Sequence, residues 1–237
     1  MHLPIEPSIL YFGTPVILVS TLNADGSTNI APMSSAWWLG WSCMLGLDGS
    51  SMTTENLQRT GECVLNLASE DNVAAVDKLA LYTGRRSVPL HKKALGYRYC
   101  RDKFEVSGFT AMESEVVEPK RIRECPVQLE ARVSGIHAFG AADRRMSVPA
   151  CAIEVTIIKV HAEESLLEDG SNCRVDSQKW RPLIMNFRHF YSLSPQLQPS
   201  RLGRGPEEVY APWKQNPMKR MATQTLLNLA SRKYEVR

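Results

Sequence analysis

The sequence predicts a mainly β protein, an antiparallel barrel decorated by peripheral helices. Short apolar runs rich in β-branched residues recur along the chain, and turn residues close each of them. Strands and helices do not alternate regularly, as a parallel doubly wound sheet would require. The one glycine-rich turn that could open such a fold, residues 46–50 (GLDGS), lacks the GxGxxG pattern.

The first half of the chain carries most of the strand signals. Residues 15–22 (PVILVSTL) form a β-branched run, and residues 23–27 (NADGS) supply an Asp-Gly turn. Residues 28–40 then resume as an extended segment, in which Pro32 marks a sheet edge or a break in pairing. Further strands are predicted over 43–50 and 63–69.

Two helices are predicted between these strands and the middle of the chain. The first covers residues 53–61, with Thr53 or Thr54 as its N-cap. The second covers residues 69–85, where apolar side chains recur at helical spacing, and ends at Gly84.

The second half begins with a long, strongly charged excursion and then returns to strands. Residues 85–125 are irregular, with a short helix, and such long excursions are usually functional or mobile. Strands are predicted over 127–140 and 150–162, the first with one solvated face. The last residues, 221–237, predict a terminal helix.

Charge and motifs exclude several functions. The 28 basic and 25 acidic residues give a formal net charge of +3, too small to indicate nucleic acid or a membrane surface as a partner. The chain has no GxSxG, HExxH or Walker motif, and its five histidines lack the spacing of metal ligands. We therefore predict no metal site, and we name no catalytic residue.

The cysteines and the N-terminus indicate the compartment. The six cysteines form no CxxC pair, and a chain of this length does not need disulfides for stability. The N-terminal residues do not read as a signal peptide, and no apolar run reaches the roughly 18 residues of a membrane span. The expectation is a reduced, soluble, cytoplasmic protein.

Polar residues at the start of the first helix could hold a phosphate. Thr53, Thr54 and Asn56 lie where free backbone N–H groups and the helix dipole favour an anion. The alternative is that they only cap the helix. Arg85 and Lys103 belong to a group of cations in the excursion, which read alone is a solvated face.

Three tryptophans cluster in residues 29–41 (NIAPMSSAWWLGW). They could simply be core residues. However, adjacent residues on a strand face opposite sides, so Trp37 and Trp38 cannot both enter one core. One of them must face a ligand, a subunit contact or solvent.

The order of these motifs resembles the flavin reductase-like, FMN-binding split-barrel family, which includes flavoredoxin and the reductases of two-component monooxygenases. The matching segments are TPVILVSTLNADGSTNIAPMSSAWW, TTENLQRTGECVLNL, DKF followed by SGF, and PLIMNFRHFYSLSPQL. The resemblance implies a split-barrel domain over residues 1–205 and a C-terminal extension over 206–237.

The resemblance also implies a homodimer with FMN bound near the subunit interface. The FMN-contacting residues that it implies are Asn29, Ala31, Pro32, Met33, Ser34, Ser35, Trp37, Trp38, Thr53, Thr54, Asn56, Arg85, Lys103 and Phe187. The sequence departs from the family in a lengthened segment, residues 87–102, which is expected to cover the nicotinamide or substrate pocket.

The function expected from the resemblance is an NAD(P)H-dependent flavin reductase, with NADH or NADPH as electron donor. A partner protein, free flavin or oxygen would then accept the electrons. Two alternatives stay open: an FMN electron carrier without NAD(P)H activity, and a barrel that has lost FMN and serves as a binding or interaction domain.

Overall fold

The computed structural model describes residues 1–146, 148–201 and 221. The chain divides into two compact units, residues 1–195 and 196–237, and the fold below is that of the first unit. The predicted extension 206–237, with its terminal helix, lies outside the described residues apart from Met221. The domain boundary at residue 205 therefore stays a prediction.

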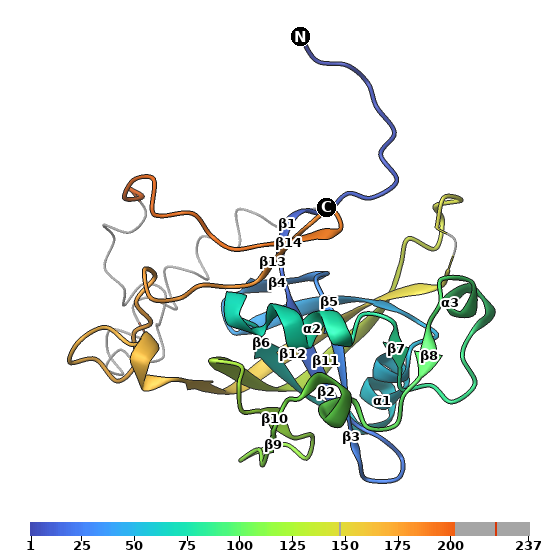
Figure 1. The fold of residues 1–237 in the computed structure, drawn as a ribbon, viewed down its shortest axis with the longest axis horizontal. Coiled ribbons are helices and arrows are strands. Elements are labelled where there is room, and N and C mark those ends of the chain that lie inside the picture. The colour runs from blue at the N-terminus through green and yellow to red at the C-terminus, as the bar shows by residue number, and fades with distance from the viewer. Residues whose placement is uncertain (147, 202–220, 222–237) are drawn as a thin grey trace. The chain divides into compact units, whose positions relative to one another are not determined.

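Strands make up most of the regular structure (Figure 1). The strands are β1 (Phe12–Pro15), β2 (Ile17–Leu22), β3 (Thr28–Met33), β4 (Ala36–Leu39), β5 (Ser42–Asp48), β6 (Glu62–Leu67), β7 (Tyr82–Thr83), β8 (Arg98–Tyr99), β9 (Ala111–Met112), β10 (Arg121–Ile122), β11 (Val127–Phe139), β12 (Ala150–Ala162), β13 (Ile184–Asn186) and β14 (His189–Tyr191). The helices are α1 (Met52–Thr60), α2 (Val73–Lys78), α3 (Leu90–Ala94) and α4 (Lys103–Ser107), with 3₁₀ turns η1 (Glu70–Asn72) and η2 (Glu164–Leu166).

One seven-stranded antiparallel sheet dominates the fold, in the order β3-β2-β6-β11-β12-β5-β4. A second sheet contains β1, β13 and β14, and β9 with β10 and β7 with β8 form two short pairs. The mainly β class with antiparallel sheets and peripheral helices is thus confirmed. Pro32 lies on β3, an edge strand, where its missing N–H is tolerated.

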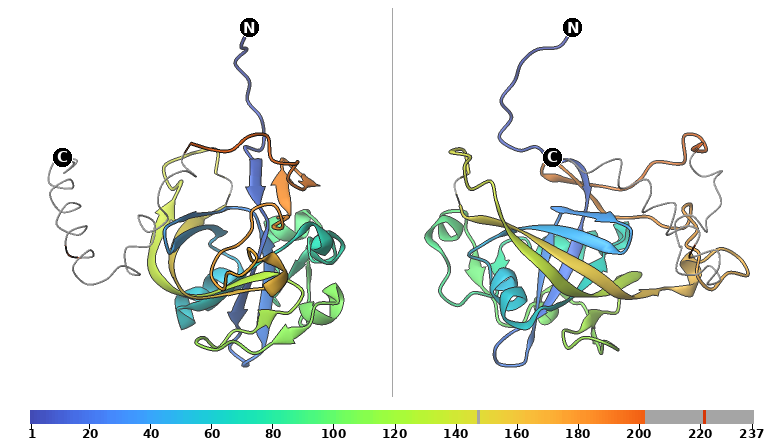
Figure 2. Two further views of the ribbon diagram at one scale, coloured as in Figure 1. Left: turned by 90° about the vertical axis from the view of Figure 1, so that its left-hand side faces the viewer. Right: turned by 180° about the vertical axis from the view of Figure 1, so that it is seen from behind.

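The chain crosses from one edge of this sheet to the other within two residues. β3 and β4 follow each other in sequence but lie at opposite edges, and Ser34 and Ser35 join them. The sheet therefore has to curl strongly, as Figure 2 shows. The Ser35 carbonyl accepts a hydrogen bond from Gly46 N (2.7 Å). The two residues lie so close that a Cβ added at Gly46 would be 3.1 Å from the Ser35 Cβ.

Two apolar cores pack on the two faces of β2. Ile17 and Val19 point into the interior of the curled sheet, whereas Leu18 points into a second core beneath α2 and α4. Double-sided burial explains why the run PVILVSTL is apolar almost without interruption. The interior core also contains Leu57 of α1, which holds that helix against the sheet.

Helix α1 lies close to its predicted position, but its N-cap is different. Ser51, in an extended conformation, accepts a hydrogen bond at Oγ from Thr54 N (3.1 Å). The prediction that Thr53 or Thr54 caps this helix is therefore wrong. Gly61 ends the helix in a left-handed conformation (φ 69°), as expected.

The second helix is shorter than predicted. η1 and α2 together cover residues 70–78, and β7 then replaces the last part of the predicted helix 69–85. β7 pairs in parallel with β8, so long-range pairing overrides the local helical pattern.

The structure also bears on the cysteines and on membrane-spanning segments. All six cysteines lie within the described residues, and each is unpaired. Among the described residues, no helix is long and apolar enough to cross a membrane.

A buried amide links the central strands to β10. Asn66 on β6 is fully buried; its Nδ2 donates to the Leu18 carbonyl (2.9 Å) and to Ser20 Oγ (2.9 Å). Its Oδ1 accepts from Ile122 N (2.8 Å). One side chain thus satisfies buried polar groups on two elements.

We expect Asn66→Ala to lower the free energy of unfolding by about 1–3 kcal/mol, because Ile122 N and the Leu18 carbonyl lose a partner in the core. Urea denaturation followed by circular dichroism measures the change. Asn172→Ala, at an exposed position, is the control and should leave stability within about 0.5 kcal/mol. Equal stability of the two variants would contradict the assigned role of Asn66.

Candidate functional site

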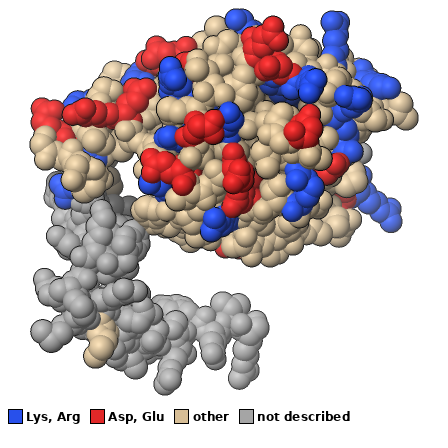
Figure 3. Space-filling model, turned by 90° about the horizontal axis from the view of Figure 1, so that it is seen from below, with Lys and Arg blue, Asp and Glu red and all other residues tan. Residues whose placement is uncertain are grey.

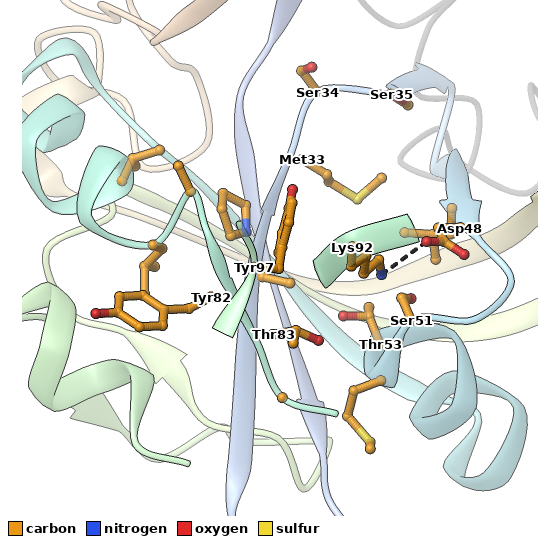
Figure 4. A pocket seen from close by; sticks show the side chains of 18 of the residues that line it. Met33, Ser34, Ser35, Asp48, Ser51, Thr53, Tyr82, Thr83, Lys92 and Tyr97 are labelled. Carbon is orange, nitrogen blue, oxygen red and sulfur yellow. Dashed lines mark ion pairs between the residues drawn. The ribbon is translucent and has the colours of Figure 1, made fainter. Parts of the chain in front are cut away.

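A cavity of about 700 Å³ lies where β3, the start of α1 and residues 82–97 meet (Figure 4). Its size is that of a small-molecule or cofactor site. All of its lining residues belong to the first unit, between Tyr11 and Phe190. Apolar side chains such as Val16, Leu79 and Met185 line part of the wall, and polar side chains gather near α1.

Eight of the fourteen predicted contact residues line this cavity. They are Asn29, Ala31, Pro32, Met33, Ser34, Ser35, Thr53 and Lys103. Six of them, Asn29 and residues 31–35, form a wall along β3 and the two serines after it. The crossing of the chain between the sheet edges therefore exposes this backbone to the cavity.

Asn29 joins the β3 wall to the start of α1. The side chain is buried, and its Nδ2 donates to Thr53 Oγ1 at 3.4 Å. Gly84 approaches it so closely that a Cβ there would lie 2.4 Å from Asn29 Oδ1. Only a residue without a side chain fits at position 84 while Asn29 keeps this place.

Two of the predicted phosphate ligands lie outside the cavity lining. Thr54 is fully buried and donates from Oγ1 to the Asp48 carbonyl (2.8 Å). Asn56 is also buried, and its Nδ2 donates to Thr21 Oγ1 (3.1 Å) and Asn23 Oδ1 (2.9 Å). These two side chains fasten α1 to β5 and to the β2–β3 hairpin. Thr53, by contrast, lines the cavity.

The two adjacent tryptophans face opposite sides, as strand alternation predicts. Trp38 packs against the interior core, whereas Trp37 is 58% exposed. Neither of them lines the cavity.

Arg85 and Phe187 also lie outside the lining. The Arg85 guanidinium pairs with Glu55 on α1. Phe187 has a left-handed backbone (φ 55°), and its ring meets Phe12 edge-on with 5.0 Å between centroids. Phe190 on β14 lines the cavity in this region.

An ion-pair cluster at the cavity wall was not predicted. The Asp48 Oδ2 lies 2.9 Å from Lys92 Nζ and 3.1 Å from His91 Nε2. Burial raises the pKa of Asp48, but hydrogen bonds from Ser50, Lys92 and His91 outweigh it and hold this pKa well below its ordinary value. The sequence shows His91 and Lys92 as part of a run of basic residues. It does not indicate that Asp48, 43 positions before His91, is their partner.

Lys103 is a buried cation beside β3. Its side chain is only 3% exposed, and Nζ donates to the Ile30 carbonyl at 2.9 Å. Burial lowers the pKa of Lys103 to about 8, assisted by the neighbouring charge of Lys92 and opposed by Cys100. Near neutral pH the cavity wall therefore carries a positive charge that solvent screens poorly.

Aromatic side chains from separate parts of the chain also line the cavity, and no pattern in the sequence predicts them. Tyr11 donates or accepts a hydrogen bond with Ser35 Oγ (2.9 Å), and Tyr97 enters from residues 87–102. Phe190 alternates with Tyr191 on β14, which is why it is the residue that faces inward. These three residues are far apart in sequence and meet only in the folded chain, so no local pattern connects them.

The charges outside the cavity are mixed. Figure 3 shows acidic and basic side chains interspersed on one face, with Lys and Arg gathered toward the side where Figure 1 places α3 and β8. The described residues contain no cluster of His, Cys, Asp and Glu that could hold a metal ion. Lys92, Lys103 and the hydroxyls near α1 beside apolar lining residues suit an organic ligand with an anionic end and an apolar portion.

Comparisons with known proteins agree with this geometry. The model of the flavin reductase like domain matches residues 9–194. An uncharacterised protein of Bacillus subtilis, YdfE, is 39% identical over 193 residues, which cover 81% of this chain and 90% of that protein.

Solved structures share the fold. Flavoredoxin of Desulfovibrio vulgaris superposes with a TM-score of 0.68 at 21% identity, covering 85% of this chain and 98% of that one. Component B of nitrilotriacetate monooxygenase from Bacillus cereus gives 0.65 at 19% identity, covering 84% and 98%. A Shewanella frigidimarina protein assigned as a flavin reductase with a split barrel domain gives 0.62 at 16% identity, covering 79% and 86%. This chain has the split-barrel fold and belongs to the flavin reductase like domain family, which supports a flavin-related oxidoreductase function.

Proposed function

We propose that this chain binds FMN in the cavity and passes electrons from NADH or NADPH through it to an acceptor. The observation that carries the proposal is the meeting, in one cavity of about 700 Å³, of the start of α1, the β3 wall and two lysines. A helix N-terminus with hydroxyls suits a phosphate, and an extended backbone wall suits a flat ring.

The anionic end of FMN would lie at the start of α1. This helix has nine residues, and its first N–H groups have no intrahelical partner. Thr53 adds a hydroxyl that lines the cavity, and Lys92 adds a cation. Thr53 is better placed than Thr54, whose hydroxyl is already bonded to the Asp48 carbonyl.

The ring system would lie along Asn29 to Ser35. Bound flavin supplies the redox chemistry, accepting a hydride and releasing electrons, while the protein binds, orients and adjusts its electrostatics. Lys103 would stabilise negative charge on a ligand beside β3, because its cation is buried and fixed by the Ile30 carbonyl. No side chain of the cavity has to act as a general acid or base.

The electrons would leave to a separate acceptor. One similar structure is named a flavoredoxin and another a monooxygenase component, which supports transfer to a partner protein; free flavin and oxygen are the other acceptors. An FMN carrier without NAD(P)H activity differs from the proposed reductase only in the source of its electrons.

A visible spectrum of the purified protein, followed by anaerobic addition of NADH or NADPH, tests the function. The reductase is expected to show a flavin spectrum that bleaches on addition of one of the two. A flavin spectrum that neither nucleotide bleaches, but a chemical reductant does, would support the carrier. Failure to bind added FMN would reject the proposal altogether.

Thr53→Ala is expected to weaken FMN binding roughly 10- to 100-fold, the cost of losing one hydrogen bond to a charged group. Thr54→Ala, one position on, should lower stability but leave the FMN dissociation constant within about threefold, since its hydroxyl braces α1. Fluorescence titration with FMN measures both constants. The reverse ranking would move the phosphate site from Thr53 to Thr54.

Lys103→Met is expected to remove a pH dependence from FMN binding. The lysine is cationic below its pKa of about 8, so the wild-type affinity should fall as pH rises from 7 to 9, by at most tenfold per pH unit.

The free energy of unfolding of the ligand-free wild type should instead rise with pH. Between about 8 and 10.5 the unfolded chain binds the extra proton, so wild-type stability rises relative to the variant by up to about 1.4 kcal/mol per pH unit.

Titrations and urea denaturation at pH 7, 8 and 9 measure these two slopes. Parallel pH profiles of wild type and Lys103→Met would show that Lys103 does not titrate in this range. Lys93→Met, at an exposed position on α3, is the charge-matched control.

We also propose that the chain forms a homodimer. On the edge strand β4, Trp37 is 58% exposed and Leu39 77% exposed, and the two share one face. Exposed apolar side chains beside unpaired strand edges are typical of protein interfaces.

Trp37→Lys is therefore expected to convert a dimer to a monomer, because it places a charge in the apolar contact. Analytical ultracentrifugation at several protein concentrations measures the mass. Leu81→Lys, at an apolar residue with 52% exposure away from β4, is the control and should leave the dimer intact. A wild-type protein that sediments as a monomer would refute the proposal.

A further inference from the structure

The lengthened segment, residues 87–102 (hereafter the strap), supplies side chains to the cavity from outside the large sheet. It contains α3 and β8. Its two tyrosines have different surroundings. Tyr97 is half-buried and lines the cavity, whereas Tyr99 is 37% exposed and its ring lies 5.8 Å from the Arg86 guanidinium carbon.

Contacts on both sides of Tyr97 fix its position. On the N-terminal side, Gly96 turns the chain in a left-handed conformation (φ 88°), and Tyr97 N donates to the Lys92 carbonyl at 3.0 Å. On the C-terminal side, Arg98 N donates to the Leu81 carbonyl (2.9 Å). Cys100 N likewise donates to the Thr83 carbonyl (2.9 Å), which continues the pairing of β8 with β7.

A charged contact holds the strap to the large sheet. Lys92 and His91 both reach the Asp48 carboxylate at the end of β5, at 2.9 and 3.1 Å. The Lys92 side chain is only 14% exposed, so solvent screens this pair less than a surface ion pair. These contacts within the protein fix the backbone that carries Tyr97.

The Tyr97 ring lies among the polar side chains that line the cavity near the start of α1. Figure 4 shows it in the middle of the labelled side chains, with Tyr82 on one side and Lys92, Asp48, Ser51 and Thr53 on the other. Tyr97 thus lines the same cavity as Ser51 and Thr53, where the anionic end of the ligand would lie.

We infer that Tyr97 is an aromatic contact residue for the bound flavin, packing against the flat ring system that lies along β3. The inference rests on the proposed function, because it needs a flat ligand in this cavity. Aromatic rings attract each other in offset or edge-to-face arrangements beyond the effect of buried area. Burial, together with the negative charge of Asp48, raises the pKa of the Tyr97 phenol, so the ring stays neutral beside an anionic ligand.

The strap thereby adds specificity that the large sheet lacks. An aromatic ring in the cavity lining favours ligands with a flat ring system over flexible phosphate esters of the same charge. The protein is expected to bind FMN with much higher affinity than ribose 5-phosphate, although both present a phosphate to α1.

Tyr97→Ala, Tyr97→Leu and Tyr97→Phe, made in the full chain, test this contact. FMN titration gives the dissociation constant, and the emission of bound flavin reports ring contact, because an electron-rich aromatic ring packed on flavin quenches its fluorescence. The Ala and Leu variants should bind FMN roughly 2- to 10-fold more weakly, with brighter bound flavin. The Phe variant should keep an affinity within about twofold.

Tyr99→Ala is the matched control, since it removes a tyrosine of the same strap that does not line the cavity. It should bind FMN like the wild type. Tyr97→Leu preserves much of the apolar volume, so it provides the comparison if Tyr97→Ala does not fold.

The outcomes separate this inference from the proposed function. If the wild type binds FMN but the Tyr97 variants match it in affinity and in flavin emission, the Tyr97 contact is refuted and the proposed function stands. If FMN affinity is unchanged while the KM for the nicotinamide donor falls, Tyr97 stands in the donor's place, which also overturns the inference. A wild type without FMN affinity refutes both.

Discussion

The rest of the structure depends on the two residues that carry the chain from one edge of the large sheet to the other. Strands that follow directly in sequence usually pair, yet β3 and β4 are the two edges of a seven-stranded sheet. Met33, which ends β3, and Ala36, which begins β4, are three positions apart, so their Cα atoms lie at most about 11 Å from each other and the sheet has to curl. This curl brings the end of β5, the start of α1 and the backbone of β3 around one cavity.

The cavity is surrounded by polar groups of two kinds. Some line it, such as Asn29, Thr53 and Lys103. Others, such as Thr54 and Asn56, hold α1 against β5 and the β2–β3 hairpin. Burying Lys103 destabilises the fold near neutral pH, as its lowered pKa indicates. A buried cation that reduces stability is typical of a site whose electrostatics serve a ligand.

Local patterns in the sequence predict much of the fold. Apolar runs and alternation predict β2, β11 and β12. The position of Gly61 directly after a helical segment predicts the end of α1. The errors have a shared cause. The helix predicted over 69–85 stops early because Tyr82 and Thr83 pair with a strand 16 residues away, and Asn56 turns toward Thr21, 35 residues earlier. Contacts between distant residues override local preference, and single-sequence patterns do not contain them.

The same reasoning explains the site. The β3 wall was predicted because its motif is continuous in sequence, whereas Asp48 and Tyr97 come from separate segments that meet only in the folded chain.

The burial of β2 on both faces affects how the domain unfolds. Because Ile17 and Leu18 are neighbours in one strand but belong to different cores, neither core can melt while the other stays intact. The first unit should therefore unfold cooperatively, in a single transition.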